Sequence, residues 1–249
     1  MGAQASLLWW PDEFCETLAA RNRYVLRFDN RDTGLSTKYP VRAPGYSLDD
    51  MADDVIAVLD GFGIARAQLV GVSMGGIIGQ IVGLKYPARL ISLVVVSSTP
   101  INGEHGNLPG PSKEFIAVAQ RGSNVDWNDR GQAVKQLLEW GRVLAGTGQA
   151  FDEAAARTLI EADFDRSGGL AHGTNHFSLK GGERWSARLP ELQPPLHVLH
   201  GRLDPLFPIE HGRALARAVP GATLVEFPGG HGPDRAAWGR LIDVLTCEG

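Results

Sequence analysis

Short apolar runs alternate with amphipathic stretches toward both ends of the chain. Such alternation is typical of a parallel β-sheet covered by helices. The run at residues 91–97 is almost wholly apolar, as expected of a strand that is buried on both faces. By this pattern we predict strands at residues 24–29, 68–72, 91–97, 196–200 and 223–227.

Helical periodicity and end signals predict the helices of the same core. One helix begins after Ser47, a good N-cap residue, and ends at Gly61 and Gly63. Its apolar face follows the spacing of successive helical turns and carries Met51, Val55, Val58, Leu59 and Phe62. Further helices are predicted at residues 11–20, 75–86, 209–219 and 235–245.

The pattern changes between residues 101 and 192, where no convincing strand occurs. Three helical stretches, at residues 113–120, 131–144 and 151–164, are separated by turns rich in Gly, Asn and Asp. After Pro194 and Pro195 the α/β alternation resumes. We therefore predict an α/β core formed by residues 1–100 and 193–249, with residues 101–192 as a helical cap inserted into it.

Composition narrows the class of protein without identifying it. The 249 residues include 24 basic and 28 acidic side chains, so there is no basic stripe for nucleic acid. The longest apolar run is far short of the ~20 residues that a membrane span needs. Two cysteines at opposite ends, Cys15 and Cys247, fit a reducing, cytoplasmic compartment. Motifs for dinucleotides, nucleoside triphosphates and zinc proteases are absent from the sequence, so we expect neither cofactor nor metal.

A G-x-S-x-G sequence runs from Gly71 to Gly75, with Ser73 at its centre. The pentapeptide alone is weak evidence, because 31 of the 249 residues are glycine. Its context is more specific, because an apolar strand precedes it and an apolar helix follows it, as in a nucleophile elbow. There Ser73 sits on a sharp turn that exposes its Oγ, and the backbone N–H of Met74 points toward a developing oxyanion. We therefore expect Ser73 to be a nucleophile.

A serine nucleophile needs a base, and that base needs an orienting acid. In this architecture the chain order is serine, then acid, then histidine. Asp204 follows the strand at residues 196–200, and His231 follows the strand at residues 223–227. Both therefore lie past the carboxyl ends of parallel strands, at the same edge as Ser73. We predict Asp204 and His231 as the acid and the base.

Other residues of the same types have less suitable positions. We expect the acids Asp29, Asp32 and Glu104 to make turns and cap N–H groups. Among the histidines we expect packed strand positions for His197 and His200, a solvated helix face for His211, and possible substrate contact from the insertion for His172 and His176.

With these motifs the sequence resembles the α/β-hydrolase superfamily, and within it the aclacinomycin methylesterase group and related mycobacterial lipase/esterases. The resemblance rests on the elbow at residues 71–76, the acid turn at residues 201–205 and the loop at residues 229–232. It rests further on stretches at residues 10–14, 27–36, 58–61 and 144–148, and covers nearly the whole chain. It implies Ser73 as nucleophile, Asp204 as orienting acid, His231 as general base and the N–H of Met74 as one oxyanion donor.

The resemblance also concerns the start of the chain. Residues 1–4 match the loop after the third strand of the family's sheet, which implies the N–H of Ala3 as the second oxyanion donor. The first three strands of the fold would then be missing. The third of them lies, in the family, between the strands placed at residues 24–29 and 68–72. We therefore expect these two strands either to pair directly or to leave backbone groups unpaired.

The sequence thus predicts a serine hydrolase that cleaves a small apolar carboxylic ester through an acyl-enzyme. The insertion would roof an apolar pocket with Phe115, Trp127, Trp140, Phe151 and Phe177, although these aromatics could equally belong to the core. A cofactor-free haloperoxidase, a C–C bond hydrolase or an acyltransferase could use the same three residues. An inactive, N-terminally truncated or ligand-binding relative is a further alternative. The oligomeric state is left open.

Overall fold

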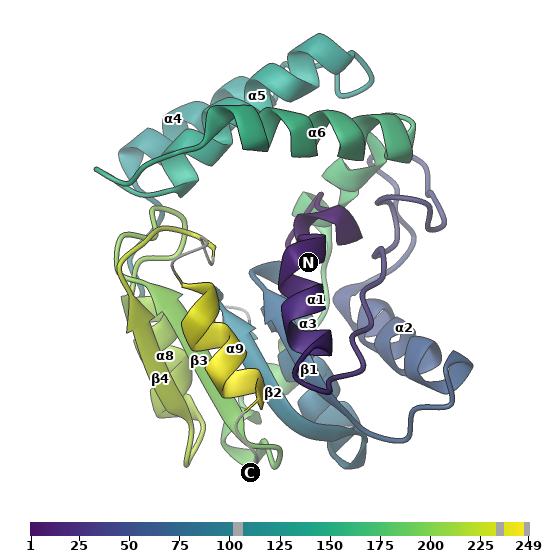
Figure 1. The fold of residues 1–249 in the computed structure, drawn as a ribbon, viewed down its shortest axis with the longest axis vertical. Coiled ribbons are helices and arrows are strands. Elements are labelled where there is room, and N and C mark those ends of the chain that lie inside the picture. Colours follow the sequence, from purple (N-terminus) through teal and green to yellow (C-terminus); the bar gives the residue numbers. More distant parts are fainter. Residues whose placement is uncertain (102–106, 233–236, 247–249) are drawn as a thin grey trace.

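The computed structural model describes residues 1–101, 107–232 and 237–246. Its centre is a parallel sheet of four strands in the order β1-β2-β3-β4 (Figure 1). The strands are β1 Ala67–Val72, β2 Leu90–Val96, β3 Leu196–Gly201 and β4 Thr223–Phe227. Because all four run in the same direction, their carboxyl ends meet at one edge of the sheet.

Helices cover both faces of the sheet. On one face lie α2 Leu48–Gly61, α3 Met74–Lys85 and α8 Glu210–Ala218, which share a buried cluster with the sheet. On the other face α1 Asp12–Ala19 and α9 Trp238–Thr246 pack against β2, β3 and β4 (Figure 1). Short 3-10 turns complete the core: η1 Leu7–Trp9, η2 Pro87–Arg89 and η5 Leu189–Glu191.

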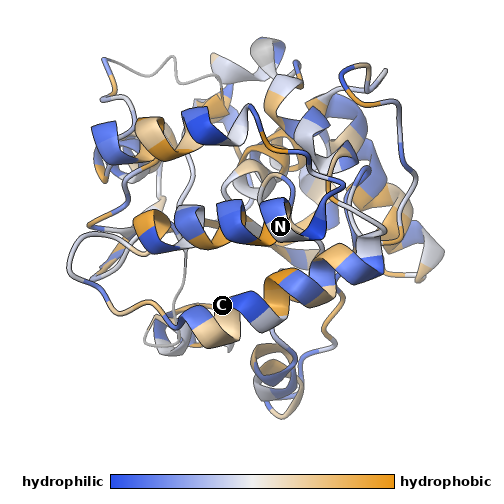
Figure 2. Cartoon of the chain, turned by 90° about the horizontal axis from the view of Figure 1, so that it is seen from above, coloured by the Kyte–Doolittle hydropathy of each residue, from blue (hydrophilic) through white to orange (hydrophobic). Residues whose placement is uncertain are grey.

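The residues between β2 and β3 form a helical layer, which we call the cap segment (residues 107–192). It contains α4 Lys113–Gly122, α5 Arg130–Leu144, α6 Glu153–Ser167, η4 His172–Ser178 and α7 Glu183–Ser186. No strand occurs in its described residues. Helices α4 to α6 lie together beyond one end of the sheet (Figure 1). Seen from above, helices alternate between hydrophilic and hydrophobic residues along their length, as amphipathic helices do (Figure 2).

Most of the elements expected from the sequence are present within a few residues of their predicted bounds. The N-cap is confirmed at Ser47, whose side chain and Asp50 form a reciprocal capping box at the start of α2. Met51, Val55 and Leu59 are buried, as predicted, but Phe62 is 60% exposed. Phe62 is the C-cap of α2, where the helix has already ended.

The strand predicted at residues 24–29 is wrong. These residues have no regular secondary structure and belong to no ladder, and Tyr24 is 77% exposed. A strand needs a hydrogen-bonded neighbour, and the described sheet pairs β1 with β2 alone. Direct pairing of this segment with β1, one of the two expected outcomes, does not occur.

Three features of the sequence fall outside the described residues. They are Glu104, Cys247 and the first residues of the helix predicted at residues 235–245. Within the described ranges, no helix combines the length and the apolar character that crossing a membrane requires.

Candidate active site

Ser73 lies on the turn between β1 and α3, in a backbone conformation that side chains rarely adopt. Its φ is 54° and its ψ is −118°, and such strain is held only where the surroundings enforce it. A Cβ at Gly71 would overlap the carbonyl of Gly75. Two residues after the end of β2, the Ser98 hydroxyl donates a 2.7 Å hydrogen bond to the Ser73 carbonyl. The sequence therefore builds the sharp turn that the G-x-S-x-G pattern predicts.

The two predicted oxyanion donors are the backbone N–H groups of Ala3 and Met74. Met74 is the first residue of α3, so its N–H belongs to the positive end of the helix. The residue before Ala3 is close to the nucleophile, since a Cβ at Gly2 would lie 3.4 Å from the Ser73 Cβ. Within the described part of the chain, neither the Ala3 N–H nor the Met74 N–H donates to a protein acceptor.

Asp204 and His231 are joined directly. The Nδ1 of His231 lies 2.8 Å from Oδ2 of Asp204, whose other oxygen accepts the N–H groups of Leu206 and Phe207 at 2.9 Å each. Burial by itself raises the pKa of Asp204, but His231 and His200 outweigh it and hold that pKa well below its ordinary value of 3.8. The carboxylate is therefore ionised at neutral pH, and Nδ1 of His231 carries the proton that it accepts.

The loop that carries His231 is packed against the cap segment. The N–H of His231 donates to the carbonyl of Leu144, the last residue of α5, over 2.7 Å. A Cβ at Gly230 would overlap the same carbonyl oxygen, so only glycine fits there. The Leu203 N–H donates to the carbonyl of Gly229 and ties this loop to the acid turn. Among the described residues, Nε2 of His231 has no hydrogen-bond partner.

The structure thus brings the predicted acid and base together and places the elbow at the same edge of the sheet. A hydrogen bond from Ser73 Oγ to His231 Nε2 is not among those of the described residues. The pairing of nucleophile and base therefore stays a prediction, as do the roles of Ala3 and Met74.

The competing side chains have structural partners. His200 is fully buried, as expected, and its Nε2 contacts the Phe207 carbonyl at 2.7 Å and Asp204 Oδ2 at 3.4 Å. His197, also on β3, is half-buried and contacts Thr223. The solvated position expected for His211 is wrong, because it is 8% exposed and its ring nitrogens contact Thr99 and Pro109. The helix face that carries it packs against the segment after β2.

The acids of the loop after residue 28 cap N–H groups, as predicted. Asp29 accepts the N–H groups of Leu7 and Leu35, and it also binds both terminal nitrogens of Arg166 on α6. Asp32 accepts the Tyr39 N–H and the Tyr46 hydroxyl. The ion pair to Arg166 was not expected from the sequence, because 137 residues separate the partners.

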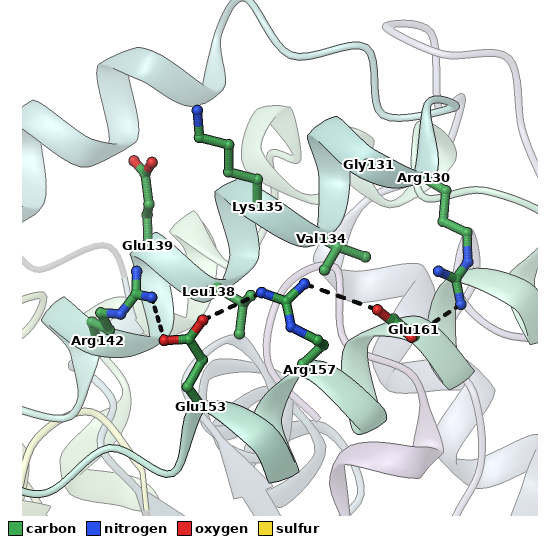
Figure 3. A pocket seen from close by; sticks show the side chains of 10 residues that line it. All are labelled: Arg130, Gly131, Val134, Lys135, Leu138, Glu139, Arg142, Glu153, Arg157 and Glu161. Atoms are coloured by element: carbon green, nitrogen blue, oxygen red, sulfur yellow. Dashed lines mark hydrogen bonds and ion pairs between the residues drawn. The ribbon is translucent and has the colours of Figure 1, made fainter.

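Two pockets are found beside the cap segment. One, of about 300 Å³, lies between α5 and α6, where Arg142, Glu153, Arg157 and Glu161 form a chain of ion pairs (Figure 3). It is charged and contains no residue of the predicted site. The other, of about 570 Å³, is lined by residues 142, 143 and 146–149 of the cap segment and by the acid turn with Asp204.

Some of the aromatic residues expected to roof a pocket contact one another. Trp140 on α5 contacts Trp127 at 5.5 Å between ring centroids and Phe177 on η4 at 6.0 Å. Phe177 is 59% exposed. Phe151 packs instead inside the cap segment, beside Val134 and Leu138. Its role is therefore that of a core residue.

Comparison with known proteins gives the class of this chain. A family model described as the alpha/beta hydrolase fold matches residues 2–233, and the chain belongs to this family. Among its sequence relatives is rhodomycin D methylesterase DauP of Streptomyces sp. (strain C5), 33% identical over 245 residues that cover 90% of this chain and 80% of that protein. Rhodomycin D methylesterase DnrP of Streptomyces peucetius is 32% identical over 245 residues, which cover the same shares of this chain and of that protein.

Solved structures agree with this fold. The esterase RhEst1 from Rhodococcus sp. ECU1013 superposes with a TM-score of 0.75 at 24% identity, covering all of this chain and 89% of that one. The resemblance to α/β-hydrolases of the methylesterase group, drawn from the sequence, is confirmed by these matches. The predicted fold class is confirmed as well.

Proposed function

We propose that this chain hydrolyses carboxylic esters through an acyl-enzyme on Ser73, with His231 as general base and Asp204 as its orienting acid. The observation that carries the proposal is the 2.8 Å contact between His231 Nδ1 and Asp204, at the sheet edge where the strained Ser73 stands. The methylesterase relatives support an ester as the substrate.

The first half-reaction forms the acyl-enzyme. His231 Nε2 takes the proton of Ser73 Oγ, and the oxygen attacks the ester carbonyl to give a tetrahedral oxyanion. The N–H groups of Met74 and Ala3 bind this oxyanion. The protonated His231 then gives its proton to the alkoxide, and the alcohol leaves. Asp204 stabilises the imidazolium while it exists.

The second half-reaction releases the acid. Water replaces the alcohol, and His231 removes a proton from it as it attacks the acyl carbon. The collapse of the second tetrahedral intermediate breaks the bond to Ser73 Oγ, which recovers its proton from His231. The products are a carboxylic acid and an alcohol. A methyl ester is the substrate type that the methylesterase relatives favour.

The direct test is active-site labelling together with product analysis. A fluorophosphonate probe should modify the protein at Ser73 and leave Ser73→Ala unmodified. Ser92→Ala is a matched control, because Ser92 is a buried serine near the opposite end of β2. Folded protein that the probe does not label would contradict the proposal. Assays on methyl esters and on 1,3-diketones would separate ester hydrolysis from C–C cleavage on the same residues.

A further inference from the structure

We propose that His176, a histidine of the cap segment, holds the N-terminal loop that supplies the Ala3 oxyanion donor, and so acts as a positioning residue for hydrolysis. The inference rests on the proposed function. It assigns to the cap segment a part in building the oxyanion site, besides any part in covering substrate.

The imidazole of His176 binds two backbone groups of the core. Its Nδ1 lies 3.0 Å from the N–H of Gln4, and its Nε2 lies 2.7 Å from the carbonyl oxygen of Arg31. Since an N–H donates and a carbonyl accepts, Nδ1 must be the bare nitrogen and Nε2 must carry the proton. One tautomer alone satisfies both contacts. His176 is 6% exposed, so water does not replace either partner freely.

The loop that His176 binds contains a residue, Gln4, in an unfavourable backbone conformation. Gln4 has a φ of 63°, in the left-handed region that side chains rarely adopt. It is 5% exposed, and its side-chain amide donates to the Leu170 carbonyl of the cap segment at 3.2 Å. A Cβ at Gly173 would lie 2.9 Å from the Gln4 Cγ. The cap segment therefore encloses Gln4 and keeps it in this conformation.

The contacts on either side of Ala3 determine where its N–H points. The Gly2 carbonyl, in the same planar peptide group as the Ala3 N–H, accepts the Ala5 N–H at 3.4 Å. The next peptide group is fixed by the bond from the Gln4 N–H to His176. Because the peptide plane that contains the Ala3 N–H and the next peptide plane are both held, this N–H is directed away from the Gly2 carbonyl, and it has no protein acceptor in the described chain. Loss of the acceptor on His176 releases the second of these planes.

The surroundings of His176 favour the neutral ring that this role requires. Burial lowers its pKa below the ordinary value of 6.5, with the Arg31 carbonyl and Asp32 opposing the shift and the Met1 amino group and Lys38 reinforcing it. A protonated ring would turn a donor toward the donor of Gln4. The acceptor is thus present at neutral pH.

Two near-isosteric variants separate the two hydrogen bonds. In His176→Asn the amide oxygen can take the place of Nδ1 and accept from Gln4, whereas in His176→Gln the amide nitrogen can take the place of Nε2 and donate to Arg31. We expect His176→Gln to lose about tenfold to a hundredfold in kcat with KM within about twofold, since deleting a whole oxyanion donor costs roughly 10²–10³. His176→Asn should stay within about threefold of the wild type in kcat. The affinity of a boronic acid, which mimics the tetrahedral intermediate, should fall in parallel with kcat/KM.

Controls keep this test apart from stability and from the proposed function. Thermal unfolding of both variants checks the fold, and His197→Gln replaces a histidine of β3 whose ring contacts the Thr223 hydroxyl. Equal kcat in the Asn and Gln variants, or a loss confined to KM, would overturn the inference. If the wild-type protein itself is not labelled by fluorophosphonate, the proposed function fails instead.

Discussion

The N–H of His231 donates to the carbonyl of Leu144 at the end of α5, over 2.7 Å. The proposed base is therefore held by the cap segment from one side and by Asp204 from the other. His176 connects the cap segment to the opposite loop, through Gln4. The loop with His231 and the loop with Gln4 thus both contact residues between β2 and β3.

The first prediction concerns Gly230, which packs against the Leu144 carbonyl. In Gly230→Ala the new methyl group overlaps that backbone oxygen, so the loop with His231 must move. We expect kcat to fall by about 10²-fold, since displacements near 1 Å in a catalytic group cost that much. Gly232→Ala is the matched control, because a Cβ there meets nothing within 4 Å. Equal activity of the two variants in an ester assay would refute the role of this packing.

A second prediction concerns the acid. In Asp204→Asn the amide can still accept the N–H groups of Leu206 and Phe207, but it no longer offers a carboxylate to His231. We expect kcat to fall by about 10³–10⁴-fold in protein that remains folded, because the imidazole loses its orientation and the stabilisation of its charged form. Steady-state kinetics and a thermal melt check this. Near-normal activity would exclude Asp204 as the orienting acid.

A third prediction concerns the ion pair between the cap segment and the core. Arg166 binds the Asp29 carboxylate with both terminal nitrogens, and the Asp29 side chain is 5% exposed. Arg166→Met leaves that carboxylate without its charge partner and should lower the free energy of unfolding by about 2 kcal/mol, less than for a fully buried pair because Arg166 is partly solvated. Arg157→Met, also on α6, removes only exposed ion pairs and should cost less than about 0.5 kcal/mol. Urea denaturation of both variants measures the difference.

The fourth prediction is a dependence of stability on pH in two ranges. The pKa of His176 in the folded protein lies below the ordinary value of 6.5. As the pH drops below 6.5, the unfolded chain therefore binds a proton that the folded chain does not yet bind, and stability falls. Asp29 and Asp204 have pKa values below 3.8, so their contribution is present above that pH and is lost below it.

The contribution of His176 to the upper pH range can be isolated by replacing it with a side chain that does not titrate. In His176→Asn the loss of stability between pH 6.5 and pH 5 should be smaller, whereas the loss below pH 3.8 should be unchanged. The pKa of His197 is also lowered by burial, so His197→Gln serves as the comparison. A His176→Asn profile identical to that of the wild type would show that His176 contributes nothing to the upper range.

The local sequence pattern was sufficient to predict many of the helices, strands and turns of this molecule. The capping box at Ser47, the all-apolar β2 and the glycines around Ser73 each depend on neighbours within a few residues. Ser73, Asp204 and His231 follow β1, β3 and β4, and this position also places them at one edge, because parallel strands share a direction. These features follow from sequence because their causes are local or follow directly from strand direction.

Burial and long-range pairing were decided by the tertiary structure alone. His211 has the sequence surroundings of a surface helix but is buried by residues about a hundred positions away, at Thr99 and Pro109. Residues 24–29 have a strand-like pattern but lack a partner strand, which no local pattern reveals. The contact of Gln4 with His176 joins residues 172 positions apart. The sequence by itself thus determined which residues the proposed chemistry could use, and the packing of the cap segment on the sheet decided which backbone groups hold them in place.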